Sequence, residues 1–193
     1  MQENDEIKQY DAWDSLDLKD DLLRGIYSFG FESPSQIQKL AIKPIIDKRD
    51  VIAQAQSGTG KTGTFTISSL QRIEISEKTT QVMILAPTHE LVKQISFVVK
   101  GIGSMMEGLV VKTLVGGTSV NEDIKQLNEN IPHVVVGSTG RVNDMIRRQH
   151  LNTSNIKLFI LDEADEMLSG GFKDQVYQIF QNLPTEAKIA VFS

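Results

Sequence analysis

Short runs of apolar, mostly β-branched residues recur along the chain, and they lack the clean polar–apolar alternation of a half-exposed strand. The runs lie at 50–55, 82–87, 110–117, 133–138, 158–163 and 188–193. Continuous apolar runs of this length are typical of strands that are buried on both faces. The pattern therefore predicts a set of strands in the interior of a sheet.

Between these runs, apolar residues recur at positions that share one face of a helix. The periodic segments are 88–103, 119–127, 140–148 and 174–183, and a further helix is expected where Phe65, Ile67 and Leu70 follow a glycine-rich turn. Strands that alternate with helices at these lengths predict βαβ units with right-handed crossovers. We therefore expect an α/β fold with a mostly parallel central sheet and helices on both faces.

The composition fits one large domain with a full apolar core. The chain has 193 residues, with 20 Lys and Arg against 25 Asp and Glu, and a formal net charge of −5. This balance argues against a uniformly basic surface for polyanions but leaves a local basic groove open. The absence of cysteine excludes disulfides and thiolate metal sites, and no apolar run reaches the ~20 residues of a membrane span. We expect a soluble intracellular chain without a membrane partner, cytoplasmic with the nucleus left open, whose first ten residues are loose.

The first apolar run leads into a glycine-rich loop, QSGTGKTGTF, and then into a helical segment. A strand, a loop ending in Gly60-Lys61-Thr62 and a helix are the elements of a Walker A phosphate-binding loop. Glycines let backbone N–H groups turn toward phosphates, Lys61 reaches the β- and γ-phosphates, and the Thr62 hydroxyl can bind Mg²⁺. The first position of the general pattern is Ala55 rather than glycine, and an ordinary glycine-rich turn is the alternative interpretation. The predicted nucleotide-contacting residues of the loop are Ser57, Gly58, Thr59, Gly60, Lys61 and Thr62.

Acidic residues follow directly after the strand part of the fifth apolar run. Because ligands bind outside the carboxyl ends of parallel strands, these acids are expected beside the phosphate-binding loop. Asp162 is assigned to Mg²⁺, through water, and Glu163 to orienting and deprotonating the water that attacks the γ-phosphate. A helix N-terminus that favours acids is the alternative, and it explains Asp165 and Glu166 better than Asp162. The predicted catalytic residues are Lys61, Asp162 and Glu163.

With AQSGTGKT (55–62) and LDEAD (161–165) together, the chain resembles the first RecA-like domain of the DEAD-box RNA helicases, closest to their translation-initiation branch. The resemblance implies a RecA-like P-loop NTPase domain at 13–193, after a flexible tail at 1–12. It implies ATP and Mg²⁺ as cofactors and RNA as a partner. It also implies a second RecA-like domain, absent from this chain, that supplies arginine fingers to the site. This part alone is therefore expected to bind nucleotide weakly and to hydrolyse it hardly at all.

The segment GFESPSQIQ (30–38) resembles the adenine-reading motif of this family. The resemblance implies that the Gln38 amide contacts the adenine edge, that Phe31 stacks on the base, and that Trp13 supports this pocket from upstream. One glutamine amide can both donate and accept along an adenine edge, which guanine does not match. The alternative is a helix that ends at Gly30, followed by a proline turn.

Three further segments resemble the RNA-facing motifs of the family: APTHEL (86–91), VGG (115–117) and GSTGRV (137–142). Each joins a strand end to a helix start or a glycine turn, where backbone N–H groups can bind phosphates. The resemblance implies that single-stranded RNA is held by its backbone, largely without regard to sequence. It assigns RNA binding to Pro87, Thr88, His89, Gly116, Gly117, Thr139, Gly140 and Arg141, with Arg141 as a fixed positive charge.

Two positions depart from the family pattern. His89 stands where the family usually has arginine, so one phosphate-directed charge is weakened or made dependent on pH. Thr139 stands where the family has proline, and Ser138 and Thr139 can both cap the following helix. We therefore expect altered RNA contact at His89 without loss of function. His133 and His150 lack metal-like spacing and are expected at the surface or at a strand edge.

Ser193 resembles the first residue of the family's Ser-Ala-Thr motif, which implies that it pairs with Asp165 and couples ATP to RNA. The leading hypothesis is an ATP-dependent RNA helicase that couples Mg-ATP hydrolysis to local unwinding of RNA. Its candidate partners are proteins of translation initiation or mRNA processing. A non-catalytic, ATP-gated RNA clamp or scaffold is the alternative, against which the intact Lys61 and Glu163 count. A DNA helicase or another P-loop ATPase is disfavoured by GFESPSQIQ together with DEAD.

Overall fold

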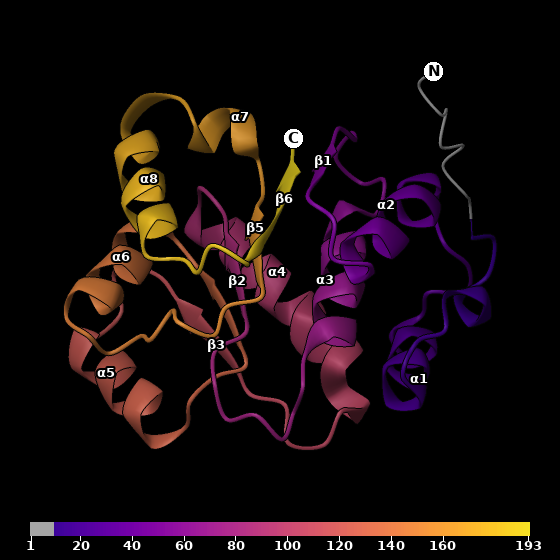
Figure 1. Cartoon of the computed structure of the whole chain (residues 1–193), viewed down its shortest axis with the longest axis horizontal. Helices are drawn as coiled ribbons and strands as arrows, with labels where there is room; N and C mark the ends of the chain where they lie inside the picture. Colours follow the sequence, from indigo (N-terminus) through magenta and orange to yellow (C-terminus); the bar gives the residue numbers. More distant parts are fainter. Residues whose placement is uncertain (1–9) are drawn as a thin grey trace.

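A parallel sheet forms the centre of the molecule (Figure 1). The computed structural model describes residues 10–193, so residues 1–9 of the predicted tail lie outside the described part. In the described part, the sheet has six strands in the order β1-β6-β5-β2-β4-β3, and all neighbouring pairs are parallel. The strands are β1 (Val51–Ala53), β2 (Val82–Leu85), β3 (Val111–Leu114), β4 (Val134–Gly137), β5 (Leu158–Leu161) and β6 (Lys188–Phe192). Each lies within one of the apolar runs, which confirms the predicted sheet.

Eight α-helices cover this sheet within residues 10–193. They are α1 (Asp20–Phe29), α2 (Gln36–Ile46), α3 (Lys61–Arg72), α4 (His89–Ile102), α5 (Val120–Glu129), α6 (Thr139–Arg147), α7 (Ala164–Met167) and α8 (Lys173–Gln181). The five helices expected from the sequence are confirmed as α3, α4, α5, α6 and α8. None of the helices described is long and apolar enough to cross a membrane.

The first two helices were not predicted from the sequence. α1 ends at Gly30, whose φ of +103° forms its C-cap, so this glycine is a helix end, while the adenine-reading assignment of 30–38 stays a prediction. α2 contains Pro44, a residue that normally argues against a helix interior. It lies in the last turn, and the helix continues for only two residues beyond it.

Two apolar cores lie on opposite faces of the sheet, because both faces of the inner strands are apolar. Ile84 and Val136 point into the first core with residues of α1 to α4, whereas Met83 and Val135 point into the second core with residues of α5 to α8. Figure 1 shows the two groups of helices on either side of the strands. Tyr10 packs against the first core, so packing already begins within the segment expected to be a tail.

The prediction of strands buried on both faces is wrong for the two edges of the sheet. Ile52 of β1 is 83% exposed, and only Leu114 of β3 is fully buried. Edge strands lack a neighbour on one side, and helices do not cover them completely. An apolar run alone does not tell an edge strand from a central one.

His133 is expected at the surface or at a strand edge; it is fully buried, so the surface placement is wrong, and it lies directly before β4. Its Nδ1 accepts a hydrogen bond from the Val110 N–H at 3.0 Å, and its Nε2 lies 3.0 Å from the Ile75 carbonyl oxygen. The first contact requires an unprotonated Nδ1, and the second therefore makes Nε2–H the donor. Burial lowers the pKa of His133, which stabilises this neutral form.

All six strands end at the same edge of the sheet, since they are parallel. The segments that follow β1, β2, β3, β4 and β5 carry nearly all of the candidate functional residues predicted from the sequence. In open α/β sheets this edge is where ligands bind.

Candidate functional site

The loop between β1 and α3 turns on glycine. Its tip, 57–59, is exposed, and α3 begins at Lys61 with Gly60 as its N-cap. Gly60 has a φ of +99°, and a Cβ at this position would lie 2.6 Å from Ser35 Oγ and 2.8 Å from Gln38 Nε2. A side chain therefore does not fit there. The first N–H groups of α3 have no acceptor within their own helix, so they and the positive end of the helix dipole face this edge.

Lys61 lies between the two acids that follow β5. Its Nζ is 3.0 Å from Glu163 Oε1 and 3.5 Å from Asp162 Oδ1. Lys61 and Asp162 are buried, at 8% and 1% exposure, whereas Glu163 is half-buried. The structure thus brings the loop lysine and the two acids together, although about a hundred residues separate them in the sequence.

The charges of this cluster shift one another's protonation. Burial by itself lowers the pKa of Lys61, but its hydrogen bond to Glu163 and the charge of Asp162 outweigh burial and raise it. Burial raises the pKa of Asp162, and the charge of Lys61 opposes that shift. Lys61 is therefore protonated, and its charge favours the ionised form of the buried Asp162 carboxylate.

Glu163 has an unusual backbone for a residue with a side chain. Its φ is +51° and its ψ is +52°, in the left-handed region, and Asp162 Oδ1 accepts its N–H at 2.9 Å. This conformation costs about 1–2 kcal/mol in a residue other than glycine. Such strain is often found at functional sites. Here the turn sets the Glu163 carboxylate beside Lys61.

The predicted Mg²⁺ donors are two oxygen groups, the Thr62 hydroxyl and the Asp162 carboxylate. Residues 10–193 contain no cluster of three or more histidines, cysteines or acids that could hold a metal by themselves. Mg²⁺ prefers oxygen ligands, keeps several waters, and usually takes further ligands from substrate phosphates. The donor set fits an ion that binds with a nucleotide.

The segment 30–38 packs against the phosphate-binding loop. Trp13 is fully buried, donates its Nε1–H to the Phe31 carbonyl oxygen at 3.1 Å, and stacks on the Phe31 ring with centroids 6.4 Å apart. Gln38 accepts the Ser35 N–H at 2.8 Å and donates to the Gly60 carbonyl oxygen at 3.2 Å. The three residues predicted to read adenine therefore form one unit with the loop.

A groove opens along the ends of β2, β3 and β4. Its lining includes the predicted RNA-binding residues Pro87, His89, Gly116, Thr139, Gly140 and Arg141, together with Gln175 of α8. The His89 ring lies beside Gly116, since a Cβ on that glycine would be 3.5 Å from the imidazole. α4, capped by the Thr88 hydroxyl on the Leu91 N–H at 3.2 Å, and α6 both begin at this groove. Their N-termini present N–H groups to an anion. Thr88 and Gly117, also predicted to bind RNA, flank the groove in sequence without lining it.

Two details of the predicted RNA face differ in the structure. Arg141 is 9% exposed and its guanidinium bonds to Asp123 and Thr118, so it is not a free charge facing the groove. No side chain caps α6, and Thr139, its first residue, donates its hydroxyl to Gln175 Oε1 at 2.5 Å. The N-cap position of Ser138 is nevertheless retained.

The predicted pair of Asp165 and Ser193 is not bonded in this structure. Asp165 is exposed in the first turn of α7, as the helix-N-terminus interpretation anticipates. The Ser193 backbone joins β6 to the β1 segment, donating to Ala53 O at 3.1 Å and accepting from Ala55 N at 3.0 Å. In residues 10–193 no hydrogen bond links the two side chains, and their predicted coupling stays a prediction.

Sequence reasoning missed three residues around the groove: Asp123, Thr118 and Gln175. Asp123 is 4% exposed on α5, a helix whose other acids are exposed. Its position on a polar stretch of the helix gave no sign that it is buried between cations. Gln175 bonds to Thr139 across 36 residues of sequence, a distance over which local pattern carries no information.

Comparisons with known proteins agree with this geometry. The family model described as DEAD/DEAH box helicase matches residues 35–193. The curated ATP-dependent RNA helicase eIF4A of Aspergillus clavatus is 58% identical over 183 residues, which cover 95% of this chain and 46% of that protein. The solved structure of a DEAD box protein from the hyperthermophile Methanococcus jannaschii has a TM-score of 0.89 at 35% identity, covering 96% of this chain and 50% of that one. S. cerevisiae Dbp5 bound to RNA and ADP BeF3 has a TM-score of 0.86 at 35% identity, covering 94% and 46%. The chain thus spans about half the length of the curated relatives it matches.

Proposed function

This chain belongs to the DEAD/DEAH box helicase family, and on that premise we propose that it forms the ATP-binding half of an ATP-dependent RNA helicase. The observation that carries the proposal is the position of Lys61, which lies between Asp162 and Glu163 at the end of the glycine-rich loop. The groove of candidate RNA contacts lies at the same edge of the sheet. A nucleotide site and an RNA site on adjoining strand ends are what the coupling of hydrolysis to RNA binding needs.

In the proposed mechanism, nucleotide phosphates compete with Glu163 for Lys61. Because Lys61 is charged, its Nζ can exchange its bond to Glu163 for bonds to the β- and γ-phosphates. The phosphates would also accept hydrogen bonds from the first N–H groups of α3. Once Lys61 has left, the Glu163 carboxylate is free to orient a water and accept its proton. Thr62 and Asp162 would hold Mg²⁺, which neutralises phosphate charge when it is bound. The proposed Mg²⁺-binding role accounts for the buried carboxylate of Asp162. The proposed water-orienting role accounts for the strained backbone of Glu163.

We also propose that Gln38 selects adenine. Its amide uses one oxygen lone pair for Ser35 and one N–H for Gly60, which leaves one acceptor and one donor for a base. An adenine edge offers both an acceptor and a donor to one amide. Phe31, anchored by Trp13, is the proposed stacking surface.

RNA is proposed to bind along the groove through its phosphates. The donors are backbone N–H groups at the starts of α4 and α6 and at the glycine turn after β3, so binding is largely independent of base sequence. The full activity of the proposed helicase would need a second RecA-like domain with arginine fingers, as the family resemblance implies. Translation-initiation or mRNA-processing proteins remain the proposed partners, and the cytoplasm the proposed location.

The test is ATP hydrolysis by the full-length protein with and without single-stranded RNA. We expect RNA to stimulate hydrolysis, and Lys61→Ala or Glu163→Gln to abolish it while the fold is kept. Full turnover by the Glu163→Gln protein would refute the assigned role of that carboxylate. RNA held in the presence of ATP, with no phosphate released over many cycles, would favour the non-catalytic clamp instead.

A further inference from the structure

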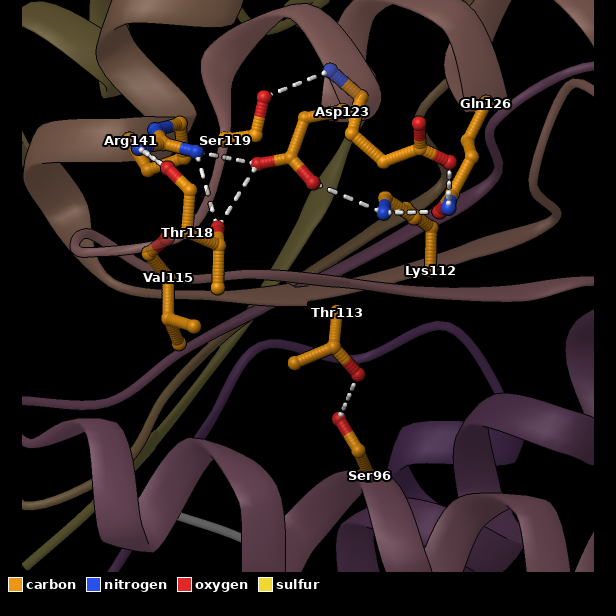
Figure 2. Close-up of polar contacts among 10 residues, drawn as sticks. Ser96, Lys112, Thr113, Val115, Thr118, Ser119, Asp123, Gln126 and Arg141 are labelled. Carbon is orange, nitrogen blue, oxygen red and sulfur yellow. Dashed lines mark hydrogen bonds and ion pairs between the residues drawn. The ribbon is translucent and has the colours of Figure 1, made fainter.

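The carboxylate of Asp123 lies between two cations next to the groove (Figure 2). Lys112 Nζ is 2.9 Å from Asp123 Oδ1, and Arg141 bonds to Asp123 Oδ2. The side chains of Asp123, Arg141 and Lys112 are 6%, 8% and 16% exposed. A buried carboxylate with two charged partners is a costly arrangement to maintain, and removing one member leaves an uncompensated charge.

Arg141 uses its guanidinium to hold the turn that follows β3. Its Nη2 donates to the Thr118 carbonyl oxygen at 2.9 Å, and its Nη1 lies 3.2 Å from Thr118 Oγ1. The Thr118 hydroxyl donates to the Val115 carbonyl oxygen at 2.9 Å, which closes the turn on itself. The turn contains Gly117, with φ +82°, a conformation that a side chain would strain. Arg141 thus connects the start of α6 to the glycine turn.

Asp123, Arg141, Lys112 and Thr118 form one polar network, and its Lys112 end holds β3. Lys112 also bonds to Gln126 of α5, and Figure 2 shows Lys112 and Thr113 pointing to opposite faces of the strand. On the face of the sheet that carries the first core, Thr113 Oγ1 donates to Ser96 Oγ of α4 at 2.7 Å. An edge strand with few buried side chains is thereby fastened to helices on both sides. Its last residue leads directly into the glycine turn.

Three of the five Arg141 N–H donors bond within this network, to Asp123 Oδ2, to Thr118 Oγ1 and to the Thr118 carbonyl oxygen. The net charge of the three ionised groups is one positive unit, since two cations face one carboxylate. Their contacts connect two parts of the groove lining, with Gly116 on one side and Thr139 and Gly140 on the other. The network thus has a geometric role.

We propose that Asp123 is a positioning residue for RNA binding, which acts by holding Arg141 and Lys112 so that the glycine turn and the start of α6 face one phosphate path. The proposal rests on the proposed function, because it takes RNA as the ligand of the groove. It names a residue that does not itself touch RNA. Its loss should weaken RNA binding although it removes a negative charge near a polyanion site.

The direction in which RNA affinity changes separates a positioning role from simple charge attraction. Asp123→Asn adds one positive charge beside the groove, and by counterion release alone RNA binding would become tighter. Removing a partner that orients a binding group typically costs roughly 10- to 100-fold in metal sites, and we expect about tenfold weaker RNA binding here. Arg141→Lys keeps the charge but cannot hold Thr118 and Asp123 with one planar fork, so the same loss is expected.

The experiment measures the affinity of the full-length protein for a labelled single-stranded oligouridylate with a non-hydrolysable ATP analogue present. The variants are Asp123→Asn and Arg141→Lys, and the control is Glu129→Gln. Glu129 lies on the same helix, is exposed, and makes the same change of charge outside the network. ADP affinity is measured in parallel and is expected to stay within about twofold, which shows that each variant is folded. In this chain without RNA, the amide signals of Gly116 and Gly117 are expected to move in both network variants and not in the control.

Wild-type or tighter RNA binding by Asp123→Asn would overturn the proposal, and so would wild-type binding by Arg141→Lys. If Asp123→Asn fails to fold, Arg141→Lys decides the question alone. A wild-type protein that does not bind RNA would refute the proposed function itself. That outcome is distinct from normal wild-type binding that the two variants leave unchanged.

Discussion

Replacing Lys61 with methionine removes the charge that faces Asp162 and leaves a side chain of similar length. In residues 10–193, Lys61 is the one cation within 4.0 Å of this carboxylate, which is 1% exposed. Burial already raises the pKa of Asp162, and the charge of Lys61 opposes that shift. The variant therefore leaves a buried carboxylate without its counter-charge, before any nucleotide is added.

The size of the effect follows from the distance and from the pH. At an effective dielectric constant of about 20, two charges 3.5 Å apart attract by about 5 kcal/mol. Asp162 can avoid part of this loss by taking up a proton, which costs about 1.4 kcal/mol for each pH unit above its ordinary pKa of about 3.9. At pH 7 that route costs about 4 kcal/mol and sets an upper limit. We expect Lys61→Met to lower the free energy of unfolding by about 2–4 kcal/mol at pH 7.

The pH dependence has a definite sign. Without Lys61, the pKa of Asp162 in the folded protein rises further above its unfolded value, so the folded state binds more protons between the two values. Stability then falls as pH increases through that window. The deficit of the variant relative to the wild type should accordingly be largest at pH 7 and shrink toward pH 4.

Urea unfolding followed by circular dichroism at pH 5 and pH 7, without nucleotide, measures both quantities. The double variant Lys61→Met/Asp162→Asn should recover most of the loss at pH 7, since no buried charge is left unpaired. Lys125→Met is the control, because Lys125 is 63% exposed and lies 4.0 Å from its partner. It should change stability by less than about 1 kcal/mol. A Lys61→Met protein as stable as this control at pH 7, or with no pH dependence, would refute the reasoning.

Other parts of the site give further expectations. Gly60→Ala should abolish the thermal stabilisation that Mg-ATP gives the wild type, because the new Cβ meets Gln38 and φ is +99°; a melt with and without Mg-ATP checks this, and full stabilisation would contradict it. Wild-type stability should fall as pH drops below about 6.5, by up to ~1.4 kcal/mol per pH unit, since burial lowers the pKa of His133. In His133→Gln this contribution should vanish. Urea titrations at several pH values check this, and a variant whose stability depends on pH as the wild type's does would contradict it. Trp13→Ala should cost about 3–5 kcal/mol in the free energy of unfolding and loosen Phe31, and a loss below ~1 kcal/mol would show that this packing contributes little.

The strands and most helices could be predicted because their apolar spacing is a local property. All six strands fall inside the predicted runs, and helices such as α4 carry a clear apolar stripe. The edge positions of β1 and β3 could not be predicted in this way, because they depend on strand order rather than on composition. α2 was missed since Pro44 argues locally against a helix that tertiary packing nevertheless completes.

The candidate site was predictable as far as strand ends place residues together. Lys61 and Glu163 come from motifs at two such ends, and the parallel sheet brings them within 3.0 Å. Arg141 shows the limit of this approach: its burial depends on Asp123, on another helix, and the arginine in a phosphate-binding motif looks the same in either case. His133 is buried for a similar reason, because its partners are backbone groups that leave no trace in the sequence pattern.

The most direct test of the nucleotide site is a titration of the isotope-labelled chain with Mg-ATP, followed through the amide signals of 57–62 and 162–163. Both groups of signals should move together and saturate at one concentration in the wild type, and Lys61→Ala should suppress the response. Saturable ATP binding that leaves both groups unmoved, or that survives Lys61→Ala unchanged, would contradict a triphosphate site between the glycine loop and the two acids.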